Sequence, residues 1–242
     1  MDKLVYVAMT GARENMTAQT VRANNLANVS TVGFKADMEQ ARAMQVFGDG
    51  FESRAYALAE NPATDVSEGS LIATGRNLDI ALQGGAWMAV QSPDGVERYT
   101  RDGRLNVLPT GELVTATGLP VLGADGAGIF VPDASNVAIN ANGAVNVLGE
   151  EDAIVGQIKM VTDAQGELFK GTDGLFRREN DEPLLLDIDQ RLSSGFLESS
   201  NVNAVAELTG MIELTKQFEV QLKMMKTAEK NSEKAATILK LS

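Results

Sequence analysis

The hydrophobic periodicity of this chain changes twice, and this change limits the folds that the chain can adopt. Near both ends, apolar and small residues recur every three or four positions, as on one face of an α-helix. Between the ends, short segments rich in strand-forming residues are separated by Asp-Gly and Asn-Gly pairs, as in antiparallel sheets. The sequence therefore predicts an α+β chain with a helix at each end and an all-β centre.

The N-terminal helix is expected over residues 3–27, about 37 Å long at the usual rise per residue. Asn28 is suited to a left-handed capping conformation, and Gly33 indicates a turn soon after the helix. The predicted apolar face consists of Val5, Met9, Ala12, Met16, Ala23 and Leu26.

The C-terminal helix is expected from about residue 203 to residue 240, a length of about 56 Å. Asn201 or Asn203 is suited to cap its start. Its large apolar side chains follow a three-four spacing at Leu208, Met211, Phe218, Leu222, Met225 and Leu239.

Each terminal helix has an apolar face that needs a partner, because an isolated helix is only marginally stable in water. We expect residues 1–35 and 199–242 to pair as a coiled-coil-like hairpin, to bind other subunits, or both. These two segments form a predicted assembly domain.

The centre of the chain, residues 76–198, is predicted to be an antiparallel β domain of sandwich or barrel type. Asp-Gly turns are expected at 94–95, 102–103, 125–126 and 173–174. Trp87 is expected in the β core or on one sheet face. Residues 36–75 show no clean period and are predicted to be an extended linker.

The charge of the chain is uneven along its length. The formal net charge is -12, of which residues 36–198 carry -15, residues 1–35 carry +2 and residues 199–242 carry +1. A negative chain is not expected to bind nucleic acid or an anionic membrane surface, since both need Lys and Arg. Nearly neutral ends suit close packing, and an acidic centre suits an exposed surface.

The amino-acid composition excludes several kinds of active site. The chain has no His and no Cys, which excludes Ser-His-Asp triads, Cys-His dyads and ordinary zinc sites. Asp187 and Asp189 alternate along a possible strand, but no EF-hand spacing surrounds them. We therefore expect neither catalysis nor a cofactor or metal.

No targeting or membrane segment is expected. No run approaches the roughly 18 apolar residues of a membrane helix, so membrane insertion is not expected. The first residues do not form a Sec signal peptide. Export from the cytoplasm would need a route without a cleaved signal.

Four segments, in the same order along the chain, resemble the flagellar rod and hook proteins. The most specific is NNLANVSTVGFK (24–35), which matches the Asn-Leu-Ala-Asn signature that follows the N-terminal helix in that family. The others are LDIALQGGAWMAVQSPDGVERYTRDGRLNV (78–107), GTDGLFRREN (171–180) and SGFLESSNVNAVAELTGMIELTKQFE (194–219).

The resemblance implies a subunit of the flagellar basal-body rod, in the part below the distal segment. It implies export by the flagellar type III apparatus, a location in the periplasm-spanning rod, and assembly with copies of itself and with other rod proteins. It also implies paired terminal helices in the inner layer of a tube that transmits torque and encloses a channel. The expected N-terminal contact is Asn24, Asn25, Leu26, Ala27 and Asn28, and the expected C-terminal contact is the apolar face described above.

Two alternatives remain at this point. One is a distal-rod member of the same family. The other is an enzyme or ligand-binding β protein that dimerises through a coiled coil, for which the C-terminal helix is long enough.

Overall fold

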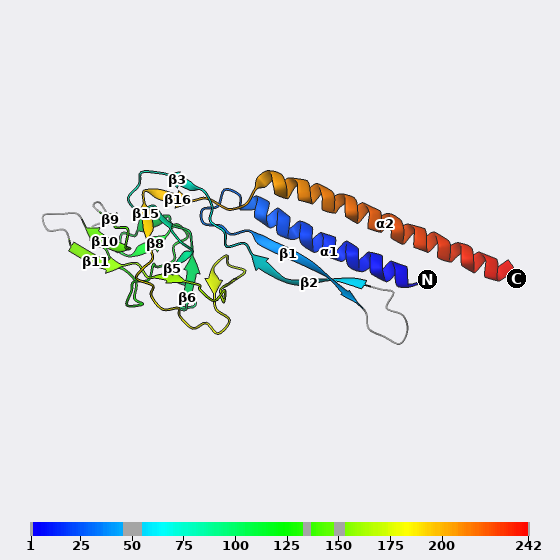
Figure 1. Cartoon of the computed structure of the whole chain (residues 1–242), viewed down its shortest axis with the longest axis horizontal. Coiled ribbons are helices and arrows are strands. Elements are labelled where there is room, and N and C mark those ends of the chain that lie inside the picture. The colour runs from blue at the N-terminus through cyan, green and yellow to red at the C-terminus, as the bar shows by residue number, and fades with distance from the viewer. Residues whose placement is uncertain (1, 46–54, 133–136, 148–152, 242) are drawn as a thin grey trace. The chain divides into compact units, whose positions relative to one another are not determined.

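The computed structural model describes residues 2–45, 55–132, 137–147 and 153–241 (Figure 1). At residues 2–4, 39–45, 55–62, 235–236 and 238–241 it describes the backbone alone. The chain divides into two compact units. The first contains Met1–Ala27, Asp37–Ala63 and Asn203–Ser242, and the second contains Asn28–Ala36 and Thr64–Val202.

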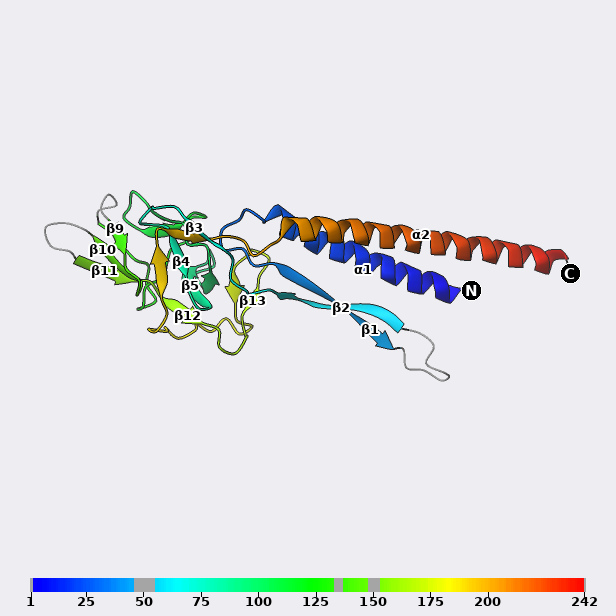
Figure 2. The same ribbon diagram turned by 45° about the horizontal axis from the view of Figure 1, so that its top comes forward.

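Both predicted helices are confirmed in the first unit. Helix α1 spans Asp2–Ala27 and helix α2 spans Ala204–Leu241. They lie side by side and run antiparallel, as Figures 1 and 2 both show. Asn203 caps α2, because its side-chain oxygen accepts hydrogen bonds from the amides of Val205 at 3.0 Å and Ala206 at 3.2 Å.

The segment predicted to be an unpatterned linker contains strands. Strands β1 (Asp37–Gln45) and β2 (Ala55–Thr64) pair with each other, and β1 contacts α1. Apolar side chains fall on odd and even positions of β1 alike, so the segment shows no alternation to reveal it. Most of this hairpin belongs to the helical unit.

The second unit is built from short antiparallel strands, as predicted. The largest sheet has the order β12-β5-β6-β14-β13, a second has the order β11-β10-β9, and three pairs join β15 to β4, β16 to β3 and β7 to β8. The strands are β3 (Leu71–Ala73), β4 (Ile80–Leu82), β5 (Ala86–Gln91), β6 (Glu97–Thr100), β7 (Leu105–Val107), β8 (Leu113–Thr115), β9 (Val137–Ile139), β10 (Ala144–Val147), β11 (Ala153–Gln157), β12 (Met160–Thr162), β13 (Phe169–Lys170), β14 (Phe176–Arg177), β15 (Leu192–Ser194) and β16 (Phe196–Glu198).

One dense core lies among these sheets. It is made of aliphatic side chains from β4, β5, β7 to β10, β12 and β15, and most expose under 5% of their surface. Trp87 faces a second cluster, where its ring centroid lies 4.2 Å from that of Phe176. The expected burial of Trp87 is confirmed.

Three of the four Asp-Gly turns are confirmed by the positive φ angles of Gly95, Gly126 and Gly174. The turn predicted at 102–103 is wrong. Gly103 has no positive φ, and a Cβ at this position would lie 1.7 Å from the carbonyl oxygen of Ile80. This glycine is needed for a close approach of two backbones.

Two local expectations need correction. Asn28 does not adopt the left-handed conformation. Among the described residues other than glycine, only Asp181 has a positive φ. Asp187 and Asp189 do not alternate along a strand, because residues 183–188 form no regular element. Within the described ranges, no His, Cys, Asp or Glu group is suited to hold a metal ion, and no helix is long and apolar enough to cross a membrane.

Candidate assembly interface

Small residues make the contact between α1 and α2. Ala8, Ala12 and Ala228 are buried, and the side chain of Gln221 lies against Gly11. The guanidinium group of Arg22 packs against Gly210 in the same way. Small side chains allow two helices to approach closely without burying large apolar groups between them.

Polar contacts then fix the two helices against each other. Nη1 of Arg22 lies 3.0 Å from Oε2 of Glu207, and Nε2 of Gln19 donates to Oγ1 of Thr215 at 3.3 Å. The Arg22 side chain is 41% exposed, so this ion pair contributes to geometry more than to stability. These polar contacts did not appear in the helical pattern of apolar residues.

Asn25 of the NNLANVSTVGFK segment lies inside the first unit. Its side chain accepts from the amide of Asp37 at 2.9 Å and donates to the carbonyl of Asp37 at 2.9 Å and to Glu207 at 3.2 Å. Asn25 exposes only 2% of its surface, so it joins α1, β1 and α2 of one chain.

Several of the large apolar residues predicted on the terminal faces are uncovered. Met9 is 51% exposed, Met16 is 58% exposed and Leu208 is 48% exposed. Further apolar side chains of the same unit are also exposed, namely Tyr6, Val205, Ile212, Val220, Leu222 and Met224. The contact between α1 and α2 therefore leaves much of the apolar surface of both helices open to a further partner.

The other predicted residues are less exposed or lie at the helix end. Val5, Leu26, Asn28, Met211, Phe218 and Met225 are half-buried, Ala12 is buried, and Asn24 and Ala27 are exposed. Val5, Leu222 and Met225 line a shallow hollow of about 410 Å³ between the helices. The side chain of Leu239 lies outside the described part of the structure.

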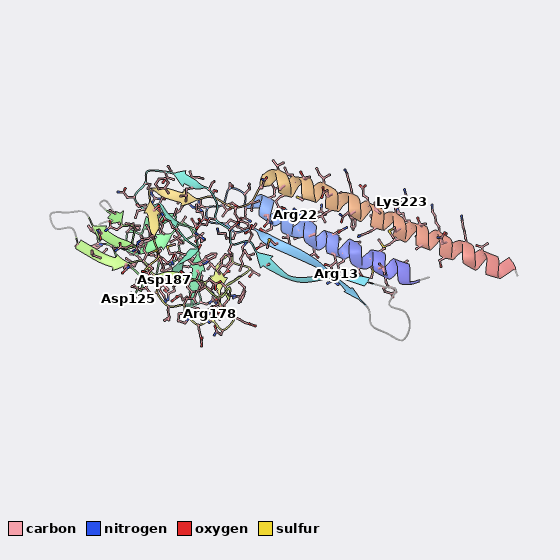
Figure 3. All side chains as sticks on the ribbon, in the orientation of Figure 1. Arg13, Arg22, Asp125, Arg178, Asp187 and Lys223 are labelled. Atoms are coloured by element: carbon pink, nitrogen blue, oxygen red, sulfur yellow. The ribbon has the colours of Figure 1, made fainter. Side chains whose placement is uncertain are left out.

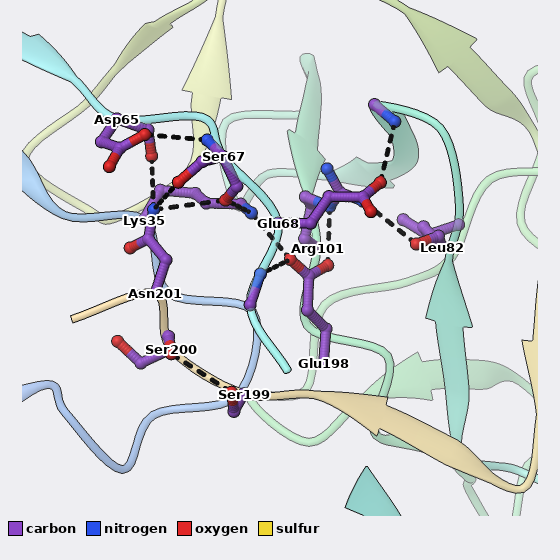
Figure 4. A network of polar contacts seen from close by, with 12 residues as sticks. Lys35, Asp65, Ser67, Glu68, Leu82, Arg101, Glu198, Ser199, Ser200 and Asn201 are labelled. Carbon is purple, nitrogen blue, oxygen red and sulfur yellow. Dashed lines mark hydrogen bonds and ion pairs between the residues drawn. The ribbon is translucent and has the colours of Figure 1, made fainter. Parts of the chain in front are cut away.

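In the second unit, the segment that follows α1 is held by a buried ion cluster (Figure 4). Nζ of Lys35 donates to Oε1 of Glu198 at 2.7 Å and to the carbonyl of Ser67 at 2.6 Å. Nε of Arg101 lies 2.8 Å from Oε2 of Glu198, and the amide of Gly69 donates to Oε1 of Glu198 at 2.9 Å. Burial lowers the pKa of Lys35, while its hydrogen bond to Glu198 acts in the opposite direction.

The same segment requires a glycine at position 33. The φ of Gly33 is 68°, and a Cβ there would lie 2.3 Å from the backbone of Arg101. Asn201 accepts from the amide of Ala36 at 2.8 Å and donates to the carbonyl of Asp65 at 2.8 Å. Residues 28–36 and 198–202 are thus tied together within the β unit. Sequence reasoning missed this, because the partners are distant along the chain.

A densely packed β unit together with a helical unit that leaves its apolar faces open defines a class of protein. It is the class of structural subunits, whose exposed apolar helical faces are suited to contacts with other subunits. The chain matches three family models: "Flagella basal body rod protein" over residues 5–35, "Flagellar hook protein FlgE/F/G D1 domain" over 81–147 and "Flagellar basal body rod FlgEFG protein C-terminal" over 193–238.

The chain is similar to known flagellar rod proteins over its whole length. It is 40% identical to the flagellar basal-body rod protein FlgF of Escherichia coli (strain K12) and 39% identical to FlgF of Salmonella typhimurium, with all of each chain covered. FlgG of Bacillus subtilis matches at 32%, over 95% of this chain and 96% of its own. The chain therefore belongs to the FlgF family of flagellar basal-body rod proteins, and it is a structural subunit of the rod.

Proposed function

We propose that the terminal helices of this rod subunit form the wall of a helical tube. In each subunit α1 and α2 pair as a coiled-coil-like hairpin, and neighbouring hairpins pack through the apolar side chains that the pair leaves open. The exposure of Met9, Met16 and Leu208 carries this proposal, because their burial between subunits would be favourable by roughly 25 cal/mol per Å² of apolar surface. Contacts of this kind that do not close produce filaments.

We further propose that the chain occupies the proximal rod, where it binds copies of itself and other rod proteins. The stronger match to FlgF relatives than to FlgG supports this position over the distal-rod alternative. The tube would transmit torque and enclose the export channel. The chain would arrive through the flagellar type III export apparatus, without a cleaved signal and without entering the membrane.

The β unit is proposed to lie outside the wall as a sandwich or barrel around its large aliphatic core. Its acidic character suits an exposed position. We propose no catalysis and no cofactor for the chain. The absence of His and Cys from the sequence supports this proposal.

Leu222→Asp tests the helical interface. The change places a charge among Val5, Met225 and the neighbouring subunit, so we expect loss of incorporation into rods and loss of motility in a strain that lacks its own copy. The β unit should remain folded, which the fluorescence of Trp87 reports, since this is the only Trp and it is buried in that unit. Thr237→Asp, at an exposed polar position of the same helix, is the matched control.

Normal motility of the Leu222→Asp variant would contradict the proposal. Sedimentation of the unassembled chain is a second check, because the rod proposal expects a monomer. A discrete, concentration-independent dimer would favour the coiled-coil rival.

A further inference from the structure

Residues 179–189 of the β unit, called the acidic loop below, are held firmly although residues 183–188 form no helix or strand. The amide of Leu184 donates to the hydroxyl oxygen of Tyr99 at 2.6 Å, and the amide of Asp187 donates to the carbonyl of Met160 at 2.9 Å. The Asp187 carboxylate accepts from Oγ1 of Thr162 at 2.7 Å and from Nε2 of Gln190 at 2.8 Å. A segment held in this way loses little conformational entropy when it binds a partner.

The acidic loop presents apolar side chains to solvent. Leu185 is 89% exposed and Ile188 is 70% exposed. A shallow hollow of about 490 Å³ beside them is lined by Leu184, Leu186 and Gln165, among others. A fixed apolar surface next to a hollow is the kind of site that a protein partner covers.

Charge restricts what the partner can be. The acidic loop contains Glu179, Asp181, Glu182, Asp187 and Asp189 and no Lys or Arg. Asp181 is paired with Arg98 at 2.9 Å, and Glu182 lies 3.9 Å from Arg178. The hollow is lined by Arg178 together with Asp163, Glu167 and Asp187, so its lining is acidic on balance. The side chains of Glu179, Glu182 and Asp189 are exposed. The same loop of a second copy is excluded by like-charge repulsion, so the partner needs apolar side chains flanked by cations.

Helix α2 carries such a surface. Lys216, Lys223 and Lys230 are spaced seven residues apart, close to two helical turns, and with Lys234 they form what we call the lysine stripe. Figure 3 shows Lys223 on the side of α2 that faces away from α1. Val220 lies within the stripe and is 58% exposed, and Met224 borders it and is 41% exposed.

We propose that the acidic loop of one copy binds the lysine stripe of a second copy in the rod. Val220 and Met224 would lie over the hollow beside Ile188, while Lys223 and Lys230, about 10 Å apart along the helix, would reach the carboxylates of the acidic loop. The contact joins two different surfaces that every copy carries, so it propagates from copy to copy. It rests on the proposed assembly and identifies one contact within it.

Charge reversal tests the contact in a strain that lacks its own copy. Lys223→Glu with Lys230→Glu places like charges together, and we expect swimming to fall at least tenfold. Adding Glu182→Lys and Asp189→Lys to the same chain restores opposite charges across the contact and should restore most of the swimming. Asp94→Lys, in an exposed turn of the β unit, is the matched control. It should not impair swimming in the parent chain, and it should not restore swimming when added to Lys223→Glu with Lys230→Glu.

Cross-linking tests the identity of the partner. Since the chain has no Cys, a chain with Glu182→Cys and Lys223→Cys carries only these two thiols. A short bismaleimide added to isolated basal bodies should give a dimer and higher multiples on a denaturing gel. A chain with either Cys alone should give none.

The proposal is overturned if the double-Cys chain supports motility but gives no dimer, or is joined to a different protein. It is also overturned if the four-residue charge exchange fails to restore swimming although thermal melting shows a folded chain. If rods that carry Lys223→Glu and Lys230→Glu assemble and turn normally, this contact does not exist. The proposed rod function would be unaffected by that result.

Discussion

Nζ of Lys35 and Oε1 of Glu198 lie 2.7 Å apart, and the two side chains expose 0% and 2% of their surface. Lys35 belongs to the segment after α1, whereas Glu198 ends β16, which pairs with β3. Glu198 also faces Arg101, so its carboxylate is shared by two buried cations, and the exposed Glu68 lies 3.5 Å from the same arginine. The β unit therefore needs residues from both ends of its sequence in order to close.

Glu198→Gln should destabilise the β unit strongly. The change leaves Lys35 and Arg101 without a full counter-charge in a buried site, a loss of about 3–5 kcal/mol for a broken buried pair. Urea unfolding followed by Trp87 fluorescence measures it. Glu179→Gln, at an exposed position, serves as the control and should change the stability by less than about 0.5 kcal/mol.

Gly103→Ala should also destabilise the β unit, because the new Cβ would meet the Ile80 carbonyl. Crowding of this kind costs about 1–3 kcal/mol and sometimes more. Gly128→Ala is the matched control, since its nearest atom would be Oε1 of Glu112 at 3.5 Å, an ordinary contact. Equal melting temperatures for the two variants would contradict the close approach at Gly103.

Hydrogen bonds from Thr162, Gln190 and the amide of Asp189 lower the pKa of Asp187 below its ordinary value of 3.8. The folded state therefore favours the ionised form. The resulting stability is fully present above pH 3.8 and is lost as the pH falls through the lower folded pKa. Asp187→Asn should melt earlier than the parent chain at pH 7, and the difference should shrink in acid. A difference that stays constant down to pH 2 would contradict the assignment.

The sequence could predict the elements but not the long-range polar contacts. Helices α1 and α2 follow from the hydrophobic period. Strand β5 follows from a short apolar run bounded by turn residues, since both of its faces are buried. Strands β15 and β16 are short and pair with β4 and β3, more than 100 residues earlier, so no local pattern marks them. The cluster of Lys35, Glu198 and Arg101 was missed for the same reason.

The predicted interface illustrates a second limit. Ala12 and Met16 share one predicted stripe, yet Ala12 is buried against the same chain and Met16 is exposed. Helical period gives the direction of a side chain to within part of a turn, and it does not say which neighbour covers it. Residue size was the missing signal, since the small residues mark the contact within the subunit.

Met9→Ser combined with Met16→Ser should separate folding from assembly. Both side chains are more than half exposed, so we expect the stability of the monomer to change by less than about 0.5 kcal/mol. Incorporation into rods should fall sharply, as measured by the amount of the chain in purified basal bodies. A variant that incorporates normally would show that the α1 face has no partner in the rod.

Thiol labelling at Leu208→Cys and Met16→Cys, in the otherwise Cys-free chain, tests most directly whether sister or neighbouring subunits cover the terminal apolar faces. Both positions should react rapidly with a soluble maleimide in the monomer and become protected at least tenfold in isolated basal bodies. Equal reactivity in the two states, or protection already complete in the monomer, would contradict the account.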